Sequence, residues 1–493
     1  MRTHMLTRWP LVAGLALVVG ACSEGLTSVN KNPNAPTDVD AQFLFPQSVR
    51  SAVENTYGRM LLAHASIWAQ QTVQIQYPDE EQGLVRTETM QAFWNNYYAG
   101  ALRDVQLVID KGVATNRPNV EAVGLIWKTW IFQQITDLWG DVPYSEALRA
   151  EEGITTPVYD TQTEIYTGMI ATLKNAEALL DPLGLGLGSG DILYGDDFEK
   201  WRRFSVSLRM RLAMRLSEVA PVTAAAEFAL ANTAGGFQST ADDAMLRWPG
   251  APYENLGFEN RVLGGRDDDG ISKTMVDTLV SMNDPRLELY AEPAVQDGAY
   301  RGLQNNTAVP PLSIANYSRI GNFWRFDGAG TPTAIMTYSE VLFLQAEAAE
   351  RGWILTPADA ALLYEAAIRA NMNQYDVCPA PCSPPANAPT DAEIDAYLLQ
   401  ARVVYTPGAA GLEQIALQKW ISLFMQGSEA WANQRRTDMP TLLPGPNLQV
   451  SRIPVRFSYP PGEQSLNLAN LTAAVTRQGG GLDVITTVWW DIN

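Results

Sequence analysis

Histidine, the side chain on which many hydrolases and metal sites depend, is scarce in this chain of 493 residues. It contains two, His4 and His64, and His4 lies in a leader segment that we expect to be removed. Ser-His-Asp or Cys-His catalysis would then depend on His64 alone, and a site with paired histidine ligands is excluded. His64 stands in the apolar helical stretch LLAHASIWAQQ, which favours a buried structural histidine.

Pairs of carboxylates offer the remaining route to catalysis, because glycosidases need only two acids at a suitable separation. Glu340, Glu347 and Glu429 are candidates, and each lies next to Lys or Arg on a segment with helical apolar spacing. That pattern is typical of structural ion pairs. The sequence offers no constellation that favours a hydrolase, and we predict no catalytic residues.

Phosphate and metal sites are also disfavoured. The glycine cluster at residues 184–190 lacks a following Lys-Ser/Thr pair and comes after a helix rather than a strand. The motif RDDDG at residues 266–270 has the composition of a calcium loop, but its acids are adjacent rather than alternating. We expect a surface turn there, and we predict no metal and no cofactor.

Two of the three cysteines, Cys378 and Cys382, form the motif CPAPC in a proline-rich loop that runs to Pro389. In an exported chain this spacing favours a disulfide that closes a small surface loop. A zinc site would need four ligands, and a redox motif would have two intervening residues rather than three. We therefore predict a Cys378–Cys382 disulfide.

The third cysteine, Cys22, stands where an apolar run meets polar sequence. Arg2 and Arg8 precede the run at residues 11–20, which is the layout of a secretory signal peptide. The box Val19-Gly20-Ala21-Cys22 resembles the lipobox of bacterial lipoproteins, in which the cysteine thiol receives a diacylglycerol. The alternative is an ordinary export signal whose cysteine is accidental.

The lipobox resemblance implies three parts at the start of the chain. Residues 1–21 are a signal peptide, and residues 22–40, which are polar and rich in Pro and Asn, are a lipidated tether. Two or three acyl chains on Cys22 hold a protein firmly on a membrane, whereas one holds it marginally. The outer-membrane lipid is thus an expected partner.

Charge excludes another class of partner. The formal net charge is −19, and it becomes −21 once the signal peptide takes away two arginines and no acid. Lys and Arg are not concentrated in any stripe, so nucleic acid is not an expected partner. With 46% hydrophobic residues the chain can bury a large core.

Apolar residues at three- and four-residue spacing predict helices over most of the chain. The predicted helical segments are residues 41–76, 91–111, 119–138, 161–180, 197–219, 334–352, 357–374, 391–401 and 412–436. Small residues at the contact between residues 334–352 and 357–374 indicate a tetratricopeptide-type hairpin. No strict period of about 34 residues runs along the chain.

Two regions lack this periodicity. Residues 235–333 are dense in Gly, Pro, Asn and Asp with scattered aromatics, and long ordered loops of this kind are commonly functional. Residues 441–493 return to loops. We expect Trp489 and Trp490 to pin the C-terminus to the core.

Six stretches together resemble the SusD/RagB family of outer-membrane lipoproteins, in its SusD-like branch. They are DLWGDVPYSEAL (137–148), LYGDDFEKWRRFSVSLRMRLAMRLS (193–217), NDPRL (283–287), MTYSEVLFLQAEAAERGW (336–353), QKWISLFMQGSEAWANQRRTDMP (418–440) and IPVRFSYP (453–460). Val206 departs from the pattern, because relatives usually have Asn there. Glu24 is the one acid close to Cys22, fewer than in a typical surface-export signal.

The resemblance implies a mainly α fold, in which tetratricopeptide-like helix pairs support a large loop-rich region. Residues 41–493 would form this SusD-like domain. Its expected parts are a helical scaffold over residues 41–234 and 334–440, a loop-rich insert over residues 235–333, and a C-terminal loop region over residues 441–493.

The resemblance also implies a role on the outer membrane, facing the cell exterior. A protein of this family is a non-catalytic receptor that captures an oligomeric nutrient, by default a glycan, and delivers it to a SusC-like TonB-dependent barrel. Two alternatives remain open at this point: a tetratricopeptide-type scaffold that binds proteins, and a surface hydrolase of glycans or peptides.

A receptor for neutral oligosaccharides needs flat apolar rings and a few polar donors. Our predicted ligand-binding set lies in or beside irregular segments and away from the matched motifs. The aromatic members are Trp94, Tyr98, Tyr300, Trp324 and Phe326, and the hydrogen-bonding members are Arg301 and Asn322.

Overall fold

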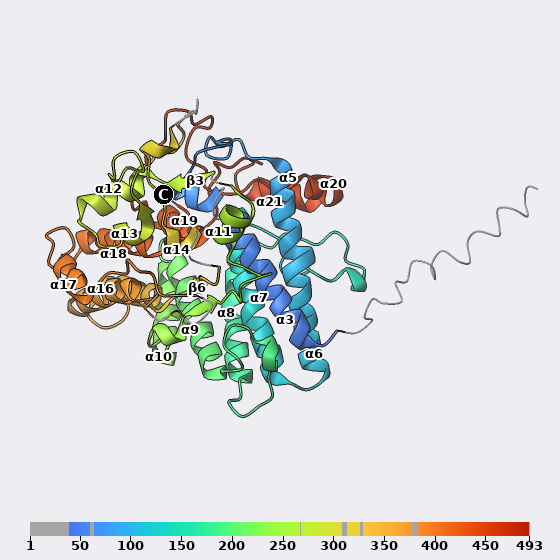
Figure 1. Ribbon diagram of the computed structural model, residues 1–493. Helices are drawn as coiled ribbons and strands as arrows, with labels where there is room; N and C mark the ends of the chain where they lie inside the picture. The colour runs from blue at the N-terminus through green and yellow to red at the C-terminus, as the bar shows by residue number, and fades with distance from the viewer. Residues whose placement is uncertain are drawn as a thin grey trace, which may run out of the picture. The chain divides into compact units, whose positions relative to one another are not determined.

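Helices lie side by side over most of the computed structural model (Figure 1), which describes residues 39–59, 64–266, 268–307, 313–325, 329–376, 378 and 382–492. The longer helices of the first half are α3 (Ala41–Glu54), α5 (Thr87–Asn95), α6 (Arg103–Ala114), α7 (Pro118–Trp139), α8 (Gln162–Leu179), α9 (Phe198–Arg215) and α10 (Pro221–Ala234). Those of the second half are α12 (Lys273–Ser281), α15 (Tyr338–Glu350), α16 (Pro357–Met372), α17 (Asp391–Leu398), α18 (Ala409–Ser422), α19 (Gly427–Thr437) and α21 (Leu468–Arg477). The shorter ones are α4 (Ser66–Trp68), α11 (Leu256–Phe258), α13 (Leu287–Tyr290), α14 (Asn322–Arg325) and α20 (Pro461–Leu466).

The strands of the described residues are short and pair two by two. β1 (Thr72–Gln74) is antiparallel to β3 (Asp269–Ile271), with Thr72 opposite Ile271. β2 (Ala244–Leu246) pairs with β6 (Thr333–Met336), and β4 (Ala291–Glu292) pairs with β5 (Arg319–Ile320), both antiparallel. Each pair therefore joins segments that are far apart in the sequence.

Helix α7 lies at the centre of the array and is buried on almost every side. It begins with Pro118, whose fixed φ and missing N–H suit the first turn of a helix. Its partner α6 approaches closely because position 124 is glycine: a Cβ there would stand 2.6 Å from Cγ1 of Ile109. Its rings include Trp127 and Trp130, stacked with centroids 4.6 Å apart.

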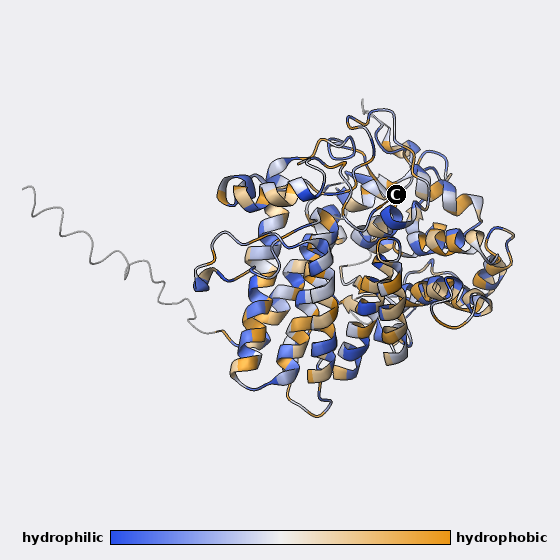
Figure 2. Cartoon of the chain, turned by 180° about the vertical axis from the view of Figure 1, so that it is seen from behind, coloured by the Kyte–Doolittle hydropathy of each residue, from blue (hydrophilic) through white to orange (hydrophobic). Residues whose placement is uncertain are grey.

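Local signals set several helix starts. Thr161 and Thr390 each form a capping box, in which the threonine hydroxyl accepts from the amide of the third helical residue and that residue's glutamate accepts in return. Helices α15 and α16 pack against each other as the predicted hairpin. Figure 2 shows orange and blue on the same helices, as expected for helices with one apolar face.

The predicted helix over residues 41–76 is wrong in its second half. Helix α3 ends at Glu54, a π-helical segment follows at Asn55–Arg59, and β1 occupies Thr72–Gln74. The apolar spacing of residues 72–76 is satisfied by pairing with β3, a tertiary contact that periodicity does not reveal. Similarly, the predicted helix 412–436 is two helices, separated around Met425, which has a positive φ of 64°.

The regions expected to be loops also contain helices. Helix α12 lies within residues 235–333, and α20 and α21 lie within residues 441–493. Trp490 is fully buried, and its Nε1 donates to Oδ1 of Asp137 at 3.0 Å, so the C-terminal tryptophan pair does pin the chain end. Residues 41–493 form one compact unit, distinct from residues 1–40. None of the helices in the described part of the chain is long and apolar enough to cross a membrane.

Candidate ligand-binding site

Charged side chains at the centre of the helical array pair with one another. The Glu429 carboxylate on α19 lies 2.6 Å from Nη2 of Arg215, and Arg211 and Lys419 contact it at 3.7 Å. Arg211 also holds Glu340 at 2.6 Å. These groups are buried and tie α9, α15, α18 and α19 together. The acids that stood as catalytic candidates are therefore structural.

Glu347, the third candidate acid, is paired in the same way. Both of its oxygens accept from Arg436, at 2.7 and 2.6 Å, and Arg351 lies 3.0 Å away. Burial alone would raise the pKa of Glu347, but these cations, with Arg436 first, lower it to about 2. A carboxyl group that stays ionised in this way does not serve as a general acid at neutral pH.

His64 is a buried core residue, as its apolar surroundings in the sequence indicate. Its ring lies between Trp68, Phe93 and Phe457, with centroid distances of 5.5, 5.3 and 5.5 Å. Burial, and then Arg86, lowers the pKa of His64 to about 3, so the imidazole is neutral at physiological pH. It packs among rings and takes no part in a cluster of polar catalytic groups.

Trp94 does not stand on a binding surface. Its indole is 5% exposed and packs within an aromatic cluster, with centroids 4.7 Å from Tyr98, 5.3 Å from Trp139 and 6.4 Å from Tyr159. The burial contradicts the prediction of an exposed ring. The sequence suggested exposure because the chain is irregular upstream of α5, but the ring points to the core face of that helix.

Trp324 is also a correction to the predicted set. It is 3% exposed and contacts Phe323, Phe424 and Tyr290, with centroids 5.2, 5.2 and 5.7 Å away. Its short helix α14 lies in the loop-rich insert, yet the ring joins the main hydrophobic core of the protein. Loop position therefore did not imply solvent contact.

The other predicted residues have varied surroundings. Tyr98 is half-buried, and its hydroxyl donates to the carbonyl of Pro143 at 2.7 Å. Arg301 is held by both oxygens of Asp297, at 3.0 and 2.9 Å. Asn322 is half-buried at the start of α14. Phe326, like Cys22 of the predicted lipobox, lies outside the described residues.

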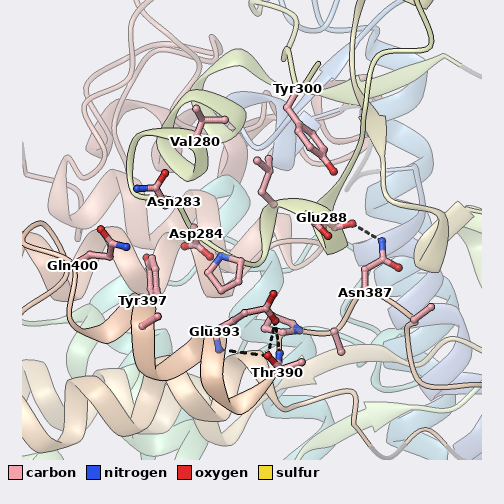
Figure 3. Close-up of a pocket in the computed structure, with 16 residues that line it drawn as sticks. Val280, Asn283, Asp284, Glu288, Tyr300, Asn387, Thr390, Glu393, Tyr397 and Gln400 are labelled. Carbon is pink, nitrogen blue, oxygen red and sulfur yellow. Dashed lines mark hydrogen bonds between the residues drawn. The ribbon is translucent and has the colours of Figure 1, made fainter. Parts of the chain in front are cut away.

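Two members of the predicted set line pockets: Trp324 borders a small one of about 30 Å³, and Tyr300 borders a much larger one. The larger pocket has a volume of about 720 Å³ and is lined by parts of residues 280–288, by Tyr300, and by parts of residues 386–400. Figure 3 shows Tyr300 at the top of the view, with Thr390 and Glu393 opposite it below. This volume is in the usual range for sites that hold small ligands.

The floor of the pocket rests on a buried arginine. Arg286 contacts the Asp284 carboxylate at 2.6 Å and also donates to Gln418 Oε1 at 2.7 Å and Asn371 Oδ1 at 2.9 Å. Its guanidinium lies under the ring of Tyr397, 5.6 Å from the centroid. The motif NDPRL therefore fixes the backbone on which the pocket is built, and its charges are satisfied internally.

One wall is the proline-rich segment that follows the disulfide. Cys378 and Cys382 are joined, with their Cα atoms 5.5 Å apart. Downstream, the side-chain amide of Asn387 donates to the backbone carbonyl of Glu288 at 2.6 Å (Figure 3). This bond fastens the wall to α13 on the other side of the pocket.

The same wall continues into the first turn of α17, which faces Tyr300 across the pocket (Figure 3). Glu393 accepts from the backbone N–H of Thr390 at 2.8 Å and from its hydroxyl at 2.7 Å. These bonds lower the pKa of Glu393. The carboxylate therefore serves the helix cap and remains an acceptor.

The lining is acidic and amide-rich. The described residues that line the pocket include Asp284, Glu288 and Glu393, but no Lys, Arg or His. Partial burial, followed by Glu288 and Glu292, raises the pKa of Tyr300, so its hydroxyl stays protonated and can donate. Such a surface repels anions and offers hydrogen bonds and apolar contacts to neutral polar molecules.

Reasoning from sequence missed most of this pocket. Asn283, Glu288, Asn387, Thr390 and Gln400 all line it, and none was in the predicted set. The motif NDPRL and the disulfide loop were both conspicuous in the sequence, and each contributes to or precedes a wall of the pocket. The contact between these two segments depends on the tertiary fold, so the sequence did not reveal it.

The chain matches the model of a family described as SusD-like, starch-binding and associating with the outer membrane, over residues 33–460. It belongs to this family. The match covers most of the chain and confirms the resemblance that the six motifs carry. It also confirms the mainly α fold expected from that resemblance.

Solved structures agree with the family assignment. A protein described as chitin-binding is 30% identical, with a TM-score of 0.79 over 92% of this chain and 99% of its own. A SusD-like protein from Bacteroidetes is 26% identical, also with a TM-score of 0.79, and covers 92% of this chain and 100% of its own. A chitin-binding SusD homologue from Flavobacterium johnsoniae is 23% identical, with a TM-score of 0.77 and coverage of 92% and 99%, and shares the fold. No curated protein sequence matches this chain.

Proposed function

We propose that this SusD-like protein is a non-catalytic receptor for a neutral oligomeric nutrient, with a glycan built from N-acetylated sugars as the first candidate. The observation that carries the proposal is the pocket of about 720 Å³ whose described lining lacks cationic side chains and combines amides, hydroxyls and one accessible tyrosine ring. The description of a 30% identical relative as chitin-binding supports the same ligand class.

The pocket chemistry suits a chain of sugar rings. Amide and hydroxyl groups of Asn283, Asn387, Thr390 and Gln400 can exchange hydrogen bonds with ring hydroxyls and acetamido groups. The Tyr300 ring offers an apolar face to a pyranose, at a small cost in side-chain entropy. The carboxylates of the lining accept hydrogen bonds and disfavour uronates or sulfated sugars.

Delivery requires a second protein. A receptor without catalytic groups or an energy source only raises the local ligand concentration, and a large oligomer does not pass a narrow passive pore. We propose that Cys22 is acylated and anchors the protein at the exterior of the outer membrane. There it would act as a lid on a SusC-like TonB-dependent barrel. The family description as associating with the outer membrane supports this placement.

Hydrolysis of the ligand is the less favoured interpretation of the same site. Glu393, a carboxylate of the lining, is committed to the cap of α17, and hydrogen bonds keep its pKa low. Relatives in this family are described as binding proteins rather than as enzymes. A tetratricopeptide-type protein-binding scaffold explains the helix pairs but gives no role to the pocket.

Calorimetric titration with two oligomers of equal length tests the ligand class. An oligomer of N-acetylglucosamine should bind, and an oligomer of uronic acids should not, at low salt concentration, where charge repulsion is least screened. Uronate binding as tight as that of the neutral oligomer would contradict the proposal. Incubation with the neutral oligomer, followed by chromatography, should show no shortened products.

Partner capture tests the delivery role. Mild detergent extraction should yield the protein with a large TonB-dependent barrel. Deletion of the barrel should abolish uptake while surface binding of the ligand persists. Unchanged uptake after deletion of the barrel would refute the delivery role and leave the binding role standing.

A further inference from the structure

The connection between α8 and α9 presents two leucines to solvent. Leu183 is 95% exposed and Leu185 is 79% exposed, within the sequence LGLGLGSG. No other large apolar side chain in the described part of the chain is as exposed as Leu183. Isolated exposed leucines are common, but here two stand on one loop with glycines on either side.

The loop backbone is held in place by Asn119 and Arg117 of the body and by Asp196 of the loop itself. Asn119 donates to the carbonyl of Asp181 at 2.9 Å and accepts from its N–H at 2.8 Å. Asp196 accepts from the N–H groups of Leu187 and Gly188, at 2.8 and 2.7 Å. Arg117 also donates to the carbonyl of Gly186. The fold thus fixes the loop on both sides of the leucines and leaves their side chains in water.

The loop lies where the N-terminal tether joins the body. Position 190 must be glycine because a Cβ there would collide with the backbone of Gln42, in the first turn of α3. Phe43, in the same turn, is also exposed, as is Val113 near the end of α6. Figure 1 shows the α8–α9 connection at the lower end of the helical array, the end from which α3 rises.

We propose that Leu183 and Leu185 insert into the surface of the lipid bilayer and thereby orient the body on the membrane. The inference rests on the proposed acylation of Cys22. The 18 residues between Cys22 and Ala41 span at most about 65 Å, so an anchored chain allows this loop to reach the bilayer. Tethering makes the contact intramolecular, and a small apolar area is then enough to bias orientation.

The chemistry of the loop favours lipid over a protein partner. Two leucines at the tip of a glycine-rich loop form a small convex apolar surface, whereas a specific protein interface needs a larger complementary patch. Apolar side chains next to a lipid anchor gain free energy on entering the acyl boundary. The neighbouring acids, Asp181 and Asp196, disfavour an anionic surface, so a zwitterionic phospholipid serves as the probe of insertion.

A fluorescent probe on the loop tests the insertion. The chain from residue 23 onward, with an N-terminal histidine tag, is bound to phosphatidylcholine vesicles that contain a nickel-chelating lipid. Because Cys378 and Cys382 form a disulfide, a cysteine introduced by Leu185→Cys is the sole free thiol and takes an environment-sensitive dye. Leu399→Cys is the matched control, since Leu399 is also 79% exposed.

We expect a blue shift of the dye at position 185 on vesicles, and quenching by spin-labelled phosphatidylcholine, with neither change at position 399. Leu183→Ser in the Leu185→Cys chain should reduce the blue shift while the circular dichroism spectrum stays the same. The proposal would be overturned by equal responses at both positions or by no response at either. It would also be overturned if the response at position 185 required the barrel. Acylation is measured separately, by flotation of the native protein with vesicles that lack nickel lipid. A failure of acylation can therefore be distinguished from a failure of loop insertion.

Discussion

Carboxylates in two regions of this protein have opposite surroundings. At the centre of the helical array, Glu340 and Glu429 are buried against Arg211, Arg215 and Lys419. In the pocket, Glu288 and Glu393 are exposed, and the lining includes no cationic side chain among the described residues. The first group holds helices together, and the second leaves its acceptors available to a ligand.

The aromatic residues show the same difference between a buried group and a group that lines the pocket. Trp324 is enclosed by Phe323, Phe424 and Tyr290, whereas Tyr300 faces the pocket. Residue type alone did not separate them, because both occur in the loop-rich insert. The difference lies in the packing partners, and it predicts which substitutions affect stability and which affect binding.

Removal of one acid from the central network should have the largest effect. Glu429→Ala removes the acid that Arg215, Arg211 and Lys419 share and leaves Lys419 buried without an ion-pair partner among the described residues. We expect this to cost about 3–5 kcal/mol of unfolding free energy, although Arg211 and Arg215 keep Glu340 and Asp137. Urea titration followed by circular dichroism measures it. Glu365→Gln, on the exposed face of α16, should change stability by less than about 0.5 kcal/mol. Equal effects of the two substitutions would show that the network is not structural.

The Trp324 side chain should behave as core. Trp324→Ala opens a cavity among three aromatic rings, and we expect a loss of about 3 kcal/mol or more. Ligand affinity of the fraction that remains folded should be unchanged, as measured by calorimetry at low temperature. A stable variant that has lost ligand binding would reverse this assignment and return the indole to the binding site.

The central network should also make the protein sensitive to acid. The pKa of Glu347 is about 2 in the folded protein, below its ordinary value, so its ionised form favours folding. This contribution, about 3 kcal/mol, is complete above about pH 5 and is lost as the pH falls toward 2. Melting temperatures recorded from pH 7 to pH 2.5 measure the loss. Glu347→Gln should be less stable at pH 7 and show a shallower decline, and a decline as steep as in the wild type would contradict the assignment.

The disulfide should contribute less to stability. Replacement of Cys378 and Cys382 by serine removes the closure of a short loop, which is worth about 2 kcal/mol in the chain-entropy model. Because the loop is followed by the pocket wall that contains Asn387, we expect weaker ligand binding as well. Thermal melts and calorimetry test the two effects. Intact affinity in the serine variant would mean that the Asn387–Glu288 hydrogen bond holds the wall unaided.

The sequence predicted the helices well where the signals are local. The starts predicted from apolar spacing at residues 119, 161 and 391 lie within a residue of those observed, where Pro118, Thr161 and Thr390 also begin or cap the helices. Residues 72–76 were predicted as helix because periodicity carries no information about a strand partner near residue 270. Glu347 pairs with Arg351, its neighbour at the end of α15, but the partners of Glu340 and Glu429 lie on other helices and depend on the tertiary fold.

The pocket was harder to predict. Trp94 and Trp324 were chosen because they lie in or beside irregular segments, but side chains from irregular segments can pack into the main core. Tyr300, chosen by the same reasoning, lines the pocket, and its role in binding stays a prediction. Asn387 and Thr390 were missed because their place opposite Glu288 depends on how the disulfide-linked segment folds back onto α13. Family membership could be inferred from motifs because they form the scaffold, and the motifs say little about the ligand.

Calorimetric titration of a Tyr300→Ala variant with an N-acetylglucosamine oligomer tests the central claim most directly. The matched control is Tyr253→Ala, which removes an exposed tyrosine that packs under Arg50 and does not line the pocket. If the pocket binds the oligomer, Tyr300→Ala should weaken affinity about tenfold, the loss expected for one ring contact, with the melting temperature preserved. Tyr253→Ala should bind like the wild type. Equal affinity of Tyr300→Ala and the wild type, or an equal loss in both variants, would place the binding site elsewhere.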